Sequence, residues 1–418
     1  MRNPSTHRFA RYVSILTTLT LSLILSTTVS AQTLKVLHNF DVTAGDGNIP
    51  YSGLIKDFAG NLYGTTLEGG AHNFGTVYRL SPIHNDDFEE TILYSFKGGA
   101  ADGANPHAPL LRDSAGNLYG TTVSGGINST VCNTTVPAIG CGVVFKLSPT
   151  TTGHWTETVL HRFTGIDGGN SYTGLVRDAV GNFYGATLLG GSKGLGTVYK
   201  LSFSSNGWKE TVLHSFTGSP DGAEPFINCT TLALDSQGNL YGSTYQGGAA
   251  NAGIVFKLTP QTSDVWTEKI LHTFQGGADG AKPLAGVILD RSGNVYGTTN
   301  VGGSGKYGTV FKLTAANGYA KTILHDFSLS DVAVAYPNGL IFDPSGNLYG
   351  TTEYAAFKLT PGETGWSETL IWYWNNSLDG LQIFAPLTID AQGNLWGTTT
   401  WGGTAGDTRG GVAFEIIP

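Results

Sequence analysis

The sequence is poor in charged residues and shows no helical pattern. Only 13% of its 418 residues are Asp, Glu, Lys or Arg, and the formal net charge is -8. No run of Lys or Arg occurs, so we expect neither nucleic acid nor an anionic membrane surface as a partner. No helical period of apolar residues is found after residue 31, and this absence favours an all-β fold.

The sequence also lacks the motifs of several common chemistries. It contains neither a Ser-His-Asp pattern nor a Gly-rich phosphate-binding motif. Its three cysteines match no zinc-binding spacing. Glycine, in contrast, is abundant at 60 residues, as expected of a chain rich in turns. No motif therefore indicates a reaction. The evidence for the fold comes from the repeats.

One ten-residue phrase recurs along the chain. It consists of Asp, two variable residues, Gly-Asn, an apolar residue, an aromatic residue, Gly and two small residues that end in Thr. The copies begin at Asp57, Asp113, Asp178, Asp235, Asp290, Asp343 and Asp390. A supersecondary unit that recurs about every 50 residues is the signature of a propeller or a solenoid.

The surroundings of the phrase predict four strands in each unit. A short apolar run at residues 54–55 precedes the first Asp and is predicted as strand A, and residues 61–66 of the phrase are strand B. Residues 75–80 follow a Gly-rich loop as strand C, and residues 210–216 are typical of strand D. These segments are short, rich in β-branched and aromatic residues, and bounded by turn residues.

The two ends of the chain predict how the repeats close into a ring. Residues 34–40 have the pattern of a strand D but precede the first strand A, while the last unit ends after a strand C at residues 411–416. Pairing of these two segments completes the last blade and removes exposed sheet edges. We therefore expect residues 32–418 to form a single domain, a seven-bladed β-propeller with four antiparallel strands per blade.

Residues 1–31 have the pattern of a signal peptide. Arg2, Arg8 and Arg11 precede an apolar stretch at residues 13–25, and small residues lead to a cleavage site near Ala31. The stretch is short and interrupted by Thr, which is unusual for a membrane span. No later segment is long enough to span, so we expect a protein secreted or retained in the periplasm.

The cysteines agree with an oxidising destination. Cys132 and Cys141 lie in one greatly extended loop between strands B and C, where a bridge would hold the loop together. We predict a disulfide between them. Cys229 stands alone, and we expect a buried thiol.

The repeated units carry a family resemblance. Asp-x-x-Gly-Asn-Leu-Tyr-Gly-Thr-Thr, then Gly-Thr-Val-Phe-Lys-Leu, then Thr-Val-Leu-His-x-Phe resemble the GloVer tandem repeats of exported bacterial proteins across the whole chain after residue 31. Strands A and B are more distantly similar to the NHL and gluconolactonase-like propellers, which include enzymes and binding modules. The resemblance implies a propeller fold and export, and it implies no reaction. Some GloVer proteins have C-terminal anchors, and the absence of one here favours free secretion or the periplasm.

In a propeller the D–A and B–C loops share one face, which usually carries the ligand. An Asp-Gly pair recurs ahead of strand A at Asp46, Asp102, Asp167, Asp221, Asp279 and Asp379. Carboxylates suit calcium, but a feature of almost every blade is more economically a turn former. The strand D histidines, His38, His161, His214, His272 and His325, also recur once per blade and are interpreted as packing residues.

Function is expected where the blades differ. Binding through the D–A and B–C loops, as a module or scaffold for a carbohydrate, cell-envelope or protein ligand, would use loop aromatics such as Tyr245 and Trp401. We expect a monomer. The alternative is a metal-dependent lactonase or lyase with its site at the central mouth. The candidate ligands for that site are His107, Glu224, Asn228 and Asn338. No metal is assigned with certainty, although calcium is one candidate.

Overall fold

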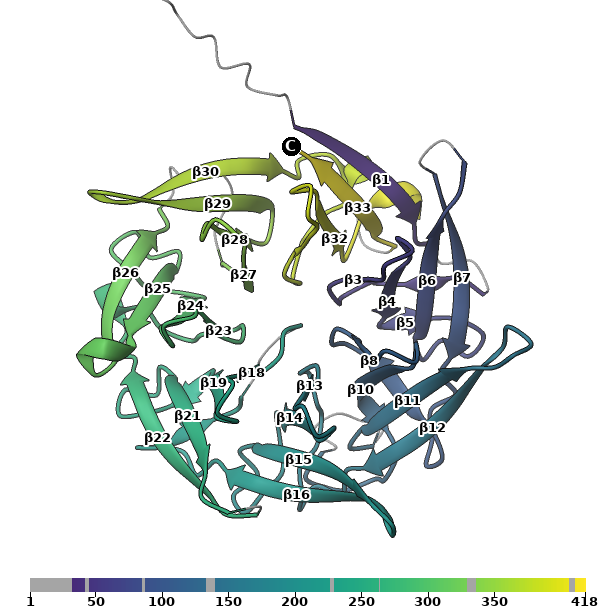
Figure 1. The fold of residues 1–418 in the computed structure, drawn as a ribbon, viewed down its shortest axis with the longest axis horizontal. Coiled ribbons are helices and arrows are strands. Elements are labelled where there is room, and N and C mark those ends of the chain that lie inside the picture. The colour runs from purple at the N-terminus through teal and green to yellow at the C-terminus, as the bar shows by residue number, and fades with distance from the viewer. Residues whose placement is uncertain are drawn as a thin grey trace, which may run out of the picture. The chain divides into compact units, whose positions relative to one another are not determined.

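The Asp of each phrase begins the turn between strands A and B, and every blade is built outward from that turn. We describe the protein from a computed structural model, which covers residues 32–41, 45–84, 87–132, 140–225, 229–262, 264–328, 336–405 and 410–418. The signal peptide predicted for residues 1–31 lies outside these residues. Antiparallel four-stranded sheets are arranged around a central axis as a seven-bladed propeller (Figure 1). This confirms the predicted fold.

The strands occupy the same four positions in every blade. The strands A nearest the axis are β3 (Ile55–Lys56), β9 (Leu111–Arg112), β13 (Val176–Arg177), β18 (Ala233–Leu234), β23 (Ile288–Leu289), β27 (Leu340–Phe342) and β31 (Thr388–Ile389). The strands B are β4 (Leu62–Thr66), β10 (Leu118–Gly125), β14 (Phe183–Thr187), β19 (Leu240–Thr244), β24 (Val295–Thr299), β28 (Leu348–Thr351) and β32 (Leu395–Thr399).

The outer strands are longer. The strands C are β6 (Thr76–Pro82), β11 (Val143–Pro149), β15 (Thr197–Ser204), β21 (Ile254–Pro260), β25 (Thr309–Thr314), β29 (Ala355–Gly362) and β33 (Val412–Ile417). The strands D are β7 (Phe88–Ser95), β12 (Trp155–Arg162), β16 (Gly207–Ser215), β22 (Trp266–Thr273), β26 (Ala320–Asp326), β30 (Gly365–Tyr373) and β1 (Thr33–Asn39). We number the blades I to VII in the order of their strands A.

Short elements join the loops of one face. The two-residue strands and short strand segments are β2 (Gly47–Asn48), β5 (Glu68–Gly69), β8 (Gly103–Pro106), β17 (Gly222–Ala223) and β20 (Gln246–Gly247). The 3-10 helices of these loops are η2 (Gly277–Asp279), η4 (Ser377–Asp379) and η5 (Gly403–Ala405), whereas η3 (Ala315–Asn317) lies in the C–D turn of blade V. β2 pairs with β5, β8 with β10, and β17 with β20, so the D–A and B–C loops lie on one face as predicted.

The ring closes between the two ends of the described chain. β1 is antiparallel to β33, with Leu34 opposite Ile416 and Val36 opposite Phe414. The N-terminal strand is therefore strand D of blade VII, as the sequence predicts (Figure 1).

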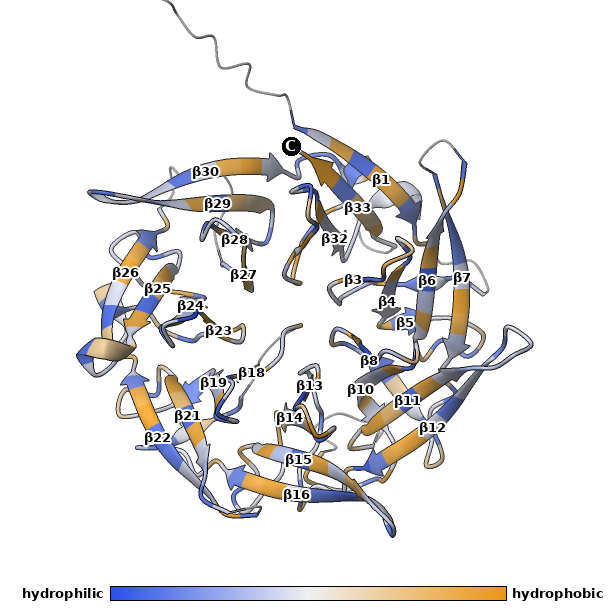
Figure 2. Ribbon diagram, in the orientation of Figure 1, coloured by the Kyte–Doolittle hydropathy of each residue, from blue (hydrophilic) through white to orange (hydrophobic). Residues whose placement is uncertain are grey.

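The core lies within and between the blades. One cluster joins Leu37 and Phe40 of blade VII to Leu62, Tyr78 and Leu80 of blade I. Apolar residues follow the strands, whereas the loops are mostly polar (Figure 2). The Gly near the end of the phrase has a packing reason, since a Cβ on Gly64 would clash with the Tyr78 hydroxyl. No helix among the described residues is long and apolar enough to cross a membrane.

Candidate functional sites

The A–B turns repeat one hydrogen-bonded arrangement. Asp57 Oδ1 accepts the backbone N–H groups of Ala59 and Asn61, both at 2.9 Å. Its Oδ2 accepts Asn61 Nδ2 and the Tyr63 hydroxyl, both at 3.0 Å. Burial raises the pKa of the Asp57 carboxyl, but these donors outweigh it and the pKa is lowered. The carboxylate is already satisfied by its own turn, so Asp57 acts as a turn former.

The same arrangement recurs around the ring. All four bonds are found again at Asp113, Asp178, Asp235 and Asp290. Asp343 keeps the bonds from the backbone and Asn347. At Asp390 the indole of Trp396 replaces the tyrosine, at 3.3 Å.

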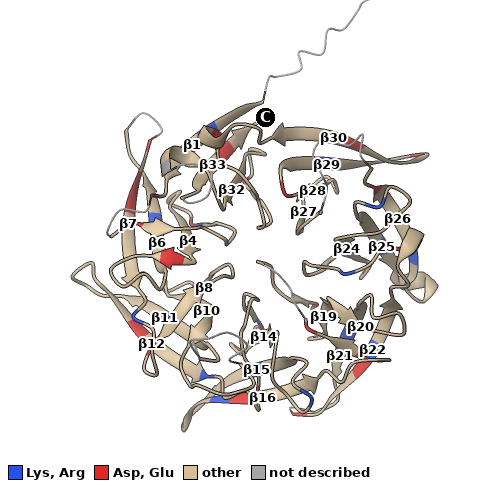
Figure 3. Ribbon diagram, turned by 180° about the vertical axis from the view of Figure 1, so that it is seen from behind, with Lys and Arg blue, Asp and Glu red and all other residues tan. Residues whose placement is uncertain are grey.

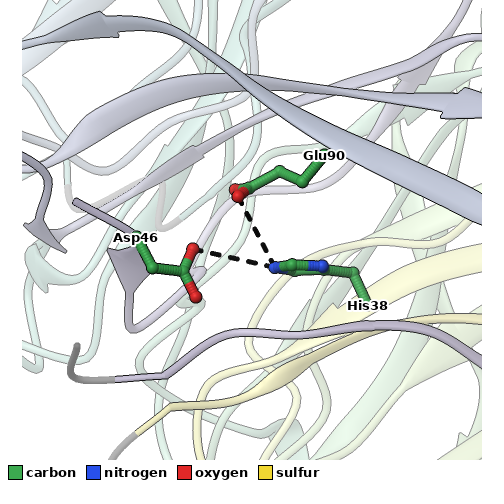
Figure 4. Close-up of side chains that lie close together, drawn as sticks. All are labelled: His38, Asp46 and Glu90. Carbon is green, nitrogen blue, oxygen red and sulfur yellow. Dashed lines mark ion pairs between the residues drawn. The ribbon is translucent and has the colours of Figure 1, made fainter. Parts of the chain in front are cut away.

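The opposite side of the ring gathers titratable groups at the joints between blades. At the joint of blades VII and I, the imidazole Nε2 of His38 lies 3.7 Å from both Asp46 Oδ1 and Glu90 Oε2 (Figure 4). His161, Asp167 and Glu210 form an equivalent group, as do His214, Asp221 and Glu268. These residue types are also metal ligands, and within each group the potential ligand atoms lie within 4.8 Å of one another.

Other joints have variants of this group, which indicate that it links neighbouring blades. We call the polar side chains at one joint a clasp. At the joint of blades I and II, the Tyr94 hydroxyl replaces imidazole and donates to Asp102 at 2.9 Å. At the joint of blades IV and V, Lys321 stands where five other joints have Glu and one has Leu34, and its Nζ lies 2.7 Å from Asp279 Oδ1. The ammonium group of Lys321 takes the place of the carboxyl group at this joint. What these joints share is therefore a polar contact that links strand D of one blade to strand D of the next.

The aspartates of these clasps are also held by their own loops. Asp102 accepts the backbone N–H groups of Lys97 and Gly103 at 2.8 and 2.6 Å. The histidine rings pack edge-on against the Phe two residues later, as His38 does on Phe40 at 4.7 Å. The expected packing role is confirmed, but the sequence reasoning missed the Asp and Glu beside His38, His161 and His214. The sequence does contain a signal for the Glu. It lies in strand D of the following blade, four residues before the His or aromatic residue of that strand.

The joint glutamates are poor acids. Burial, followed by the charge of Asp167, raises the pKa of Glu210 to about 8. Burial and Asp102 raise the pKa of Glu157 to about 7, and burial raises that of Glu268 to about 7 against the opposing charge of His214. Burial and Asp46 also raise the pKa of Glu90. A protonated carboxyl at these positions is uncharged beside the ionised aspartate.

The central mouth is crossed by aromatic side chains. Tyr51 stacks on Phe384 at 4.9 Å and contacts the His107 ring at 4.1 Å, and His107 meets Tyr172 edge-on at 4.8 Å. Cys229 Sγ lies 3.5 Å from His107 Nδ1. His107 is only 5% exposed, and burial lowers its pKa to about 3. Its imidazole is therefore neutral and packed among side chains that precede the strands A.

The other predicted mouth residues have separate partners. Asn338 is buried and donates from Nδ2 to the Ile383 carbonyl at 2.8 Å. Glu224 accepts a hydrogen bond from Gln246 Nε2 at 2.6 Å. Asn228 lies outside the described residues. The only groups of three or more His, Cys, Asp and Glu found among the described residues are the three joint clusters, and neither His107 nor Glu224 belongs to one.

The rim residues predicted for binding also contact neighbours. Lys282 Nζ lies 5.0 Å from the centre of the Tyr245 ring, a cation–π contact across a blade joint. Trp401 exchanges backbone hydrogen bonds with Leu381 at 2.7 and 2.9 Å, and its side chain is half-buried.

Glu224 belongs to a ring of residues with left-handed backbone. Its φ is 51°, and a residue with positive φ that is not glycine recurs at the matched D–A position of every joint: Ile49, Asn105, Asn170, Glu224, Lys282, Tyr336 and Gln382. The Glu224 N–H donates to Leu195 of blade III at 2.8 Å, and its carbonyl accepts from Tyr245 of blade IV at 2.9 Å. This conformation lets one residue pair with both blades.

The predicted disulfide is confirmed and staples the extended loop of blade II. Cys132 and Cys141 are bonded and buried. The loop packs against the connection to blade III, since a Cβ on Gly165 would lie 3.1 Å from the Cβ of Val131. Ile127, Val131 and Ile166 are 41%, 39% and 83% exposed there.

A cavity lies on the face of the ring that carries the A–B turns. A cavity of about 660 Å³ is lined by strand A and turn residues of blades VII, I and II, including Lys56, Asp57, Arg112 and Ile389. The sequence reasoning ended each strand A one residue too early, and so it missed the basic residues that directly precede Asp57, Asp113 and Asp178. Charged residues are otherwise scattered around the ring (Figure 3).

The comparisons with known proteins agree with this architecture. The Gloeobacter/Verrucomicrobia repeat matches residues 20–225, 129–356 and 267–418. Because these matches cover most of the chain, the protein belongs to this repeat family, as the resemblance implied. No protein of curated function matches the sequence.

Several solved structures share the fold. Virginiamycin B lyase from Staphylococcus aureus is 12% identical, with 93% of this chain and 99% of that chain covered and a TM-score of 0.54. The extracellular domain of a one-component system from B. thetaiotaomicron is 11% identical over 91% of this chain and 40% of that chain, with a TM-score of 0.54. PorZ, a surface component of the type-IX secretion system of Porphyromonas gingivalis, is 13% identical over 90% and 47%, with a TM-score of 0.51. At these identities the similarity shows the fold alone.

Proposed function

We propose that the protein is an exported binding module that holds a protein partner on its D–A and B–C face. The contact surface is the stapled loop of blade II with its neighbour, residues 127–132 and 164–166, which we call the blade II patch. The observation that carries this proposal is the exposed aliphatic group Ile127, Val131 and Ile166. Export is supported by the leader pattern of residues 1–31 and by the disulfide.

The patch is apolar and preorganised. Single exposed aliphatic residues are ordinary, but three on two packed loops form a surface from which a partner can displace water. The segments 127–132 and 164–166 contain no charged residue. The nearby Asp167 is turned to its own loop, where it accepts the Thr164 N–H at 2.8 Å. The disulfide limits the loop conformations, which lowers the entropy cost of binding.

The chemistry of the patch favours a protein over a carbohydrate. Sugar rings are commonly held on flat aromatic faces together with polar groups. The blade II patch instead offers branched aliphatic side chains, which pack into the apolar centre of a protein interface. Tyr245 and Trp401, the aromatic residues expected at the rim, are half-buried.

Site-specific photo-crosslinking tests the proposal. A photoreactive phenylalanine analogue at Ile166 of the exported protein, in the cells that produce it, should give a discrete adduct with a partner protein. The matched control is Val180, which is 85% exposed in the A–B turn of blade III. Mass spectrometry identifies the adducts.

The partner then allows a quantitative test with purified proteins. The double variant Ile127→Ser, Ile166→Ser should bind at least about tenfold more weakly, because burial of each aliphatic side chain contributes about 1.5–3 kcal/mol. Val180→Ser should bind as the parent does. Absence of an adduct at position 166, equal adducts at 166 and 180, or capture of glycan alone would refute a protein-binding patch.

A further inference from the structure

The cavity on the A–B face has the form of a small-molecule site. Its volume of about 660 Å³ falls within the range of about 300–1,000 Å³ that is typical of such pockets. Ile55, Leu111 and Ile389 contribute apolar wall, and the charged lining residues are Lys56, Arg112, Asp57, Asp113 and Asp390. The cavity is on the opposite side of the ring from the blade II patch.

A smaller apolar hollow lies near the wider cavity. A second hollow of about 200 Å³ is lined by Pro109, Val287, Leu340 and Pro386, among others. Pro109 directly precedes Leu110, which lines the wider cavity, and Ile288 of the smaller hollow occupies the strand A position that Leu111 has in the wider one. The aromatic layer around Tyr51 lies beyond them, ahead of the strands A. Apolar residues of the strands A therefore line both hollows.

The last residue of strand A divides the ring into a basic and an apolar arc. Blades I to III have Lys56, Arg112 and Arg177 directly before the Asp, whereas blades IV to VII have Leu234, Leu289, Phe342 and Ile389. This residue covers the strand B aromatic of the preceding blade. The Arg112 guanidinium lies 5.8 Å from the Tyr63 ring centre, and Phe342 contacts Tyr296 edge-on at 5.1 Å. Because apolar residues serve at four joints, packing alone does not require a charge.

Lys56 has a structural explanation. Strand C carries Lys or Arg at the position beside the strand B aromatic in six blades, but blade VII has Glu415. Lys56 reaches over from blade I, with its Nζ 4.0 Å from the Trp396 ring centre and 3.1 Å from Asp390 Oδ2. It therefore replaces the missing cation at the closing blade.

Arg112 has no such explanation. Blade I already has Arg79, and both arginines act on the Tyr63 hydroxyl. The Arg112 guanidinium forms an ion pair with Asp57 at 3.8 Å from Oδ2, a distance beyond that of a hydrogen bond. The Asp57 oxygens already accept four hydrogen bonds. Arg112 thus brings to the cavity a planar set of donors that is not hydrogen-bonded to the Asp57 turn.

We propose that this cavity binds a small amphiphile with one anionic head group, either a carboxylate or a phosphate. The head group accepts the paired N–H donors of Arg112, since a guanidinium matches either anion. The apolar part of the ligand lies against the strand A walls and points towards the smaller hollow. This site is independent of the protein-binding function proposed above.

Isothermal titration calorimetry of the disulfide-bonded exported protein tests the proposal with three probes that share one alkyl chain. Decanoate and decyl phosphate carry the two anionic groups, and 1-decanol carries none. At least one anion, below its micellar concentration, should bind about tenfold or more tightly than decanol, the effect expected of one hydrogen bond to a charged group. Which anion binds identifies the head group. Failure of both anions, or equal binding of decanol, overturns the proposal.

Variants place the head group at Arg112. Arg112→Leu gives blade II the residue type that blade IV has at Leu234, and it should weaken binding of the anion about tenfold or more while decanol is unaffected. Arg112→Gln is a second neutral variant in case the first fails to fold. The control Arg291→Leu removes an exposed arginine from the A–B turn of blade V and should change nothing. Unchanged anion binding in both Arg112 variants, or an equal loss in Arg291→Leu, overturns the assignment.

Discussion

The two faces of the ring are built from the same repeats but vary in different ways. On the A–B face, the Asp, Asn and Tyr side chains bond alike in five blades, and the residue before the Asp changes from basic to apolar around the ring. On the D–A face, the backbone of the left-handed residue recurs while its side chain changes from Ile49 to Glu224 to Tyr336. A repeated turn needs one fixed set of side-chain bonds, whereas a position held by its backbone leaves its side chain open to change.

The faces should also respond differently to pH. A fall in pH should destabilise both faces, because Asp57 in its turn and Asp221 at its joint have lowered pKa values, and the stability they add is lost as pH falls below the unfolded value near 3.8. A rise in pH should destabilise the joints on the D–A side. Glu157, Glu210 and Glu268 have folded pKa values of about 7, 8 and 7, raised mainly by burial. Their contribution is complete below the unfolded pKa of 4.5 and lost as pH rises through those values.

The largest predicted effect is therefore a loss of stability between pH 5 and pH 9. Each glutamate lowers the free energy of unfolding by at most about 1.4 kcal/mol per pH unit between its unfolded and folded pKa values. Urea unfolding across this range measures the slope. Glu210→Gln, which mimics the protonated acid, should make the slope shallower, whereas Glu363→Gln in an exposed C–D turn should not. A stability that is constant or rises from pH 5 to pH 9 contradicts the clasp.

A single turn on the A–B face should be the next most sensitive element. Asp235→Ala leaves two backbone N–H groups, Asn239 and Tyr241 without their acceptor. We expect the free energy of unfolding to fall by about 2–4 kcal/mol, because buried donors lose their partner. Urea unfolding at neutral pH measures it. Asp264→Ala, in the exposed C–D turn of the same blade, should cost less than about 0.5 kcal/mol. Equal losses would show that the turn network adds little.

The sequence predicts the repeated side of this comparison well. The Asp of the phrase needs only the donors that follow it within six residues, so Asp57, Asn61 and Tyr63 could be read together. The closure of β1 on β33 follows from a leftover strand, and Cys132 pairs with the nearest cysteine. Contacts between blades are harder to predict from the sequence. Glu90 meets Asp46 and His38 only because strand D of one blade lies beside the loop from the preceding blade, and no local pattern contains that register.

The predicted mouth site shows the same limit. His107 and Asn338 both precede a strand A, which placed them near the axis from sequence. Their surroundings depend on Tyr51, Phe384 and Cys229, which come from other repeats. Arg112 was missed for a local reason, since the apolar run before each Asp appeared to end one residue earlier. A tabulation of the residue before each phrase would have revealed the basic and apolar arcs.

The disulfide should affect the D–A face alone. Replacement of Cys132 and Cys141 by Ser should lower the free energy of unfolding by about 2 kcal/mol, a cost estimated for a short closed loop. Hydrogen exchange should increase at the amides of residues 127–132 and 169–170, which the bridge holds against blade III. The turn amide of Asn239, on the opposite face, is the internal control. Equal increases at both places would mean that the bridge stabilises the whole ring.

The smallest predicted effect falls on the residue that the sequence singled out as the only carboxylate of the mouth. Glu224→Gly should change the free energy of unfolding by less than about 0.5 kcal/mol, because glycine adopts the φ of 51° without strain. That gain offsets the lost hydrogen bond from Gln246. Glu224→Val should cost more than about 1 kcal/mol, since a β-branched residue is strained at positive φ. Urea unfolding ranks the two variants. If Gly is as costly as Val, the carboxylate itself stabilises the joint, and the side chains of this face are less free to vary than its backbone pattern indicates.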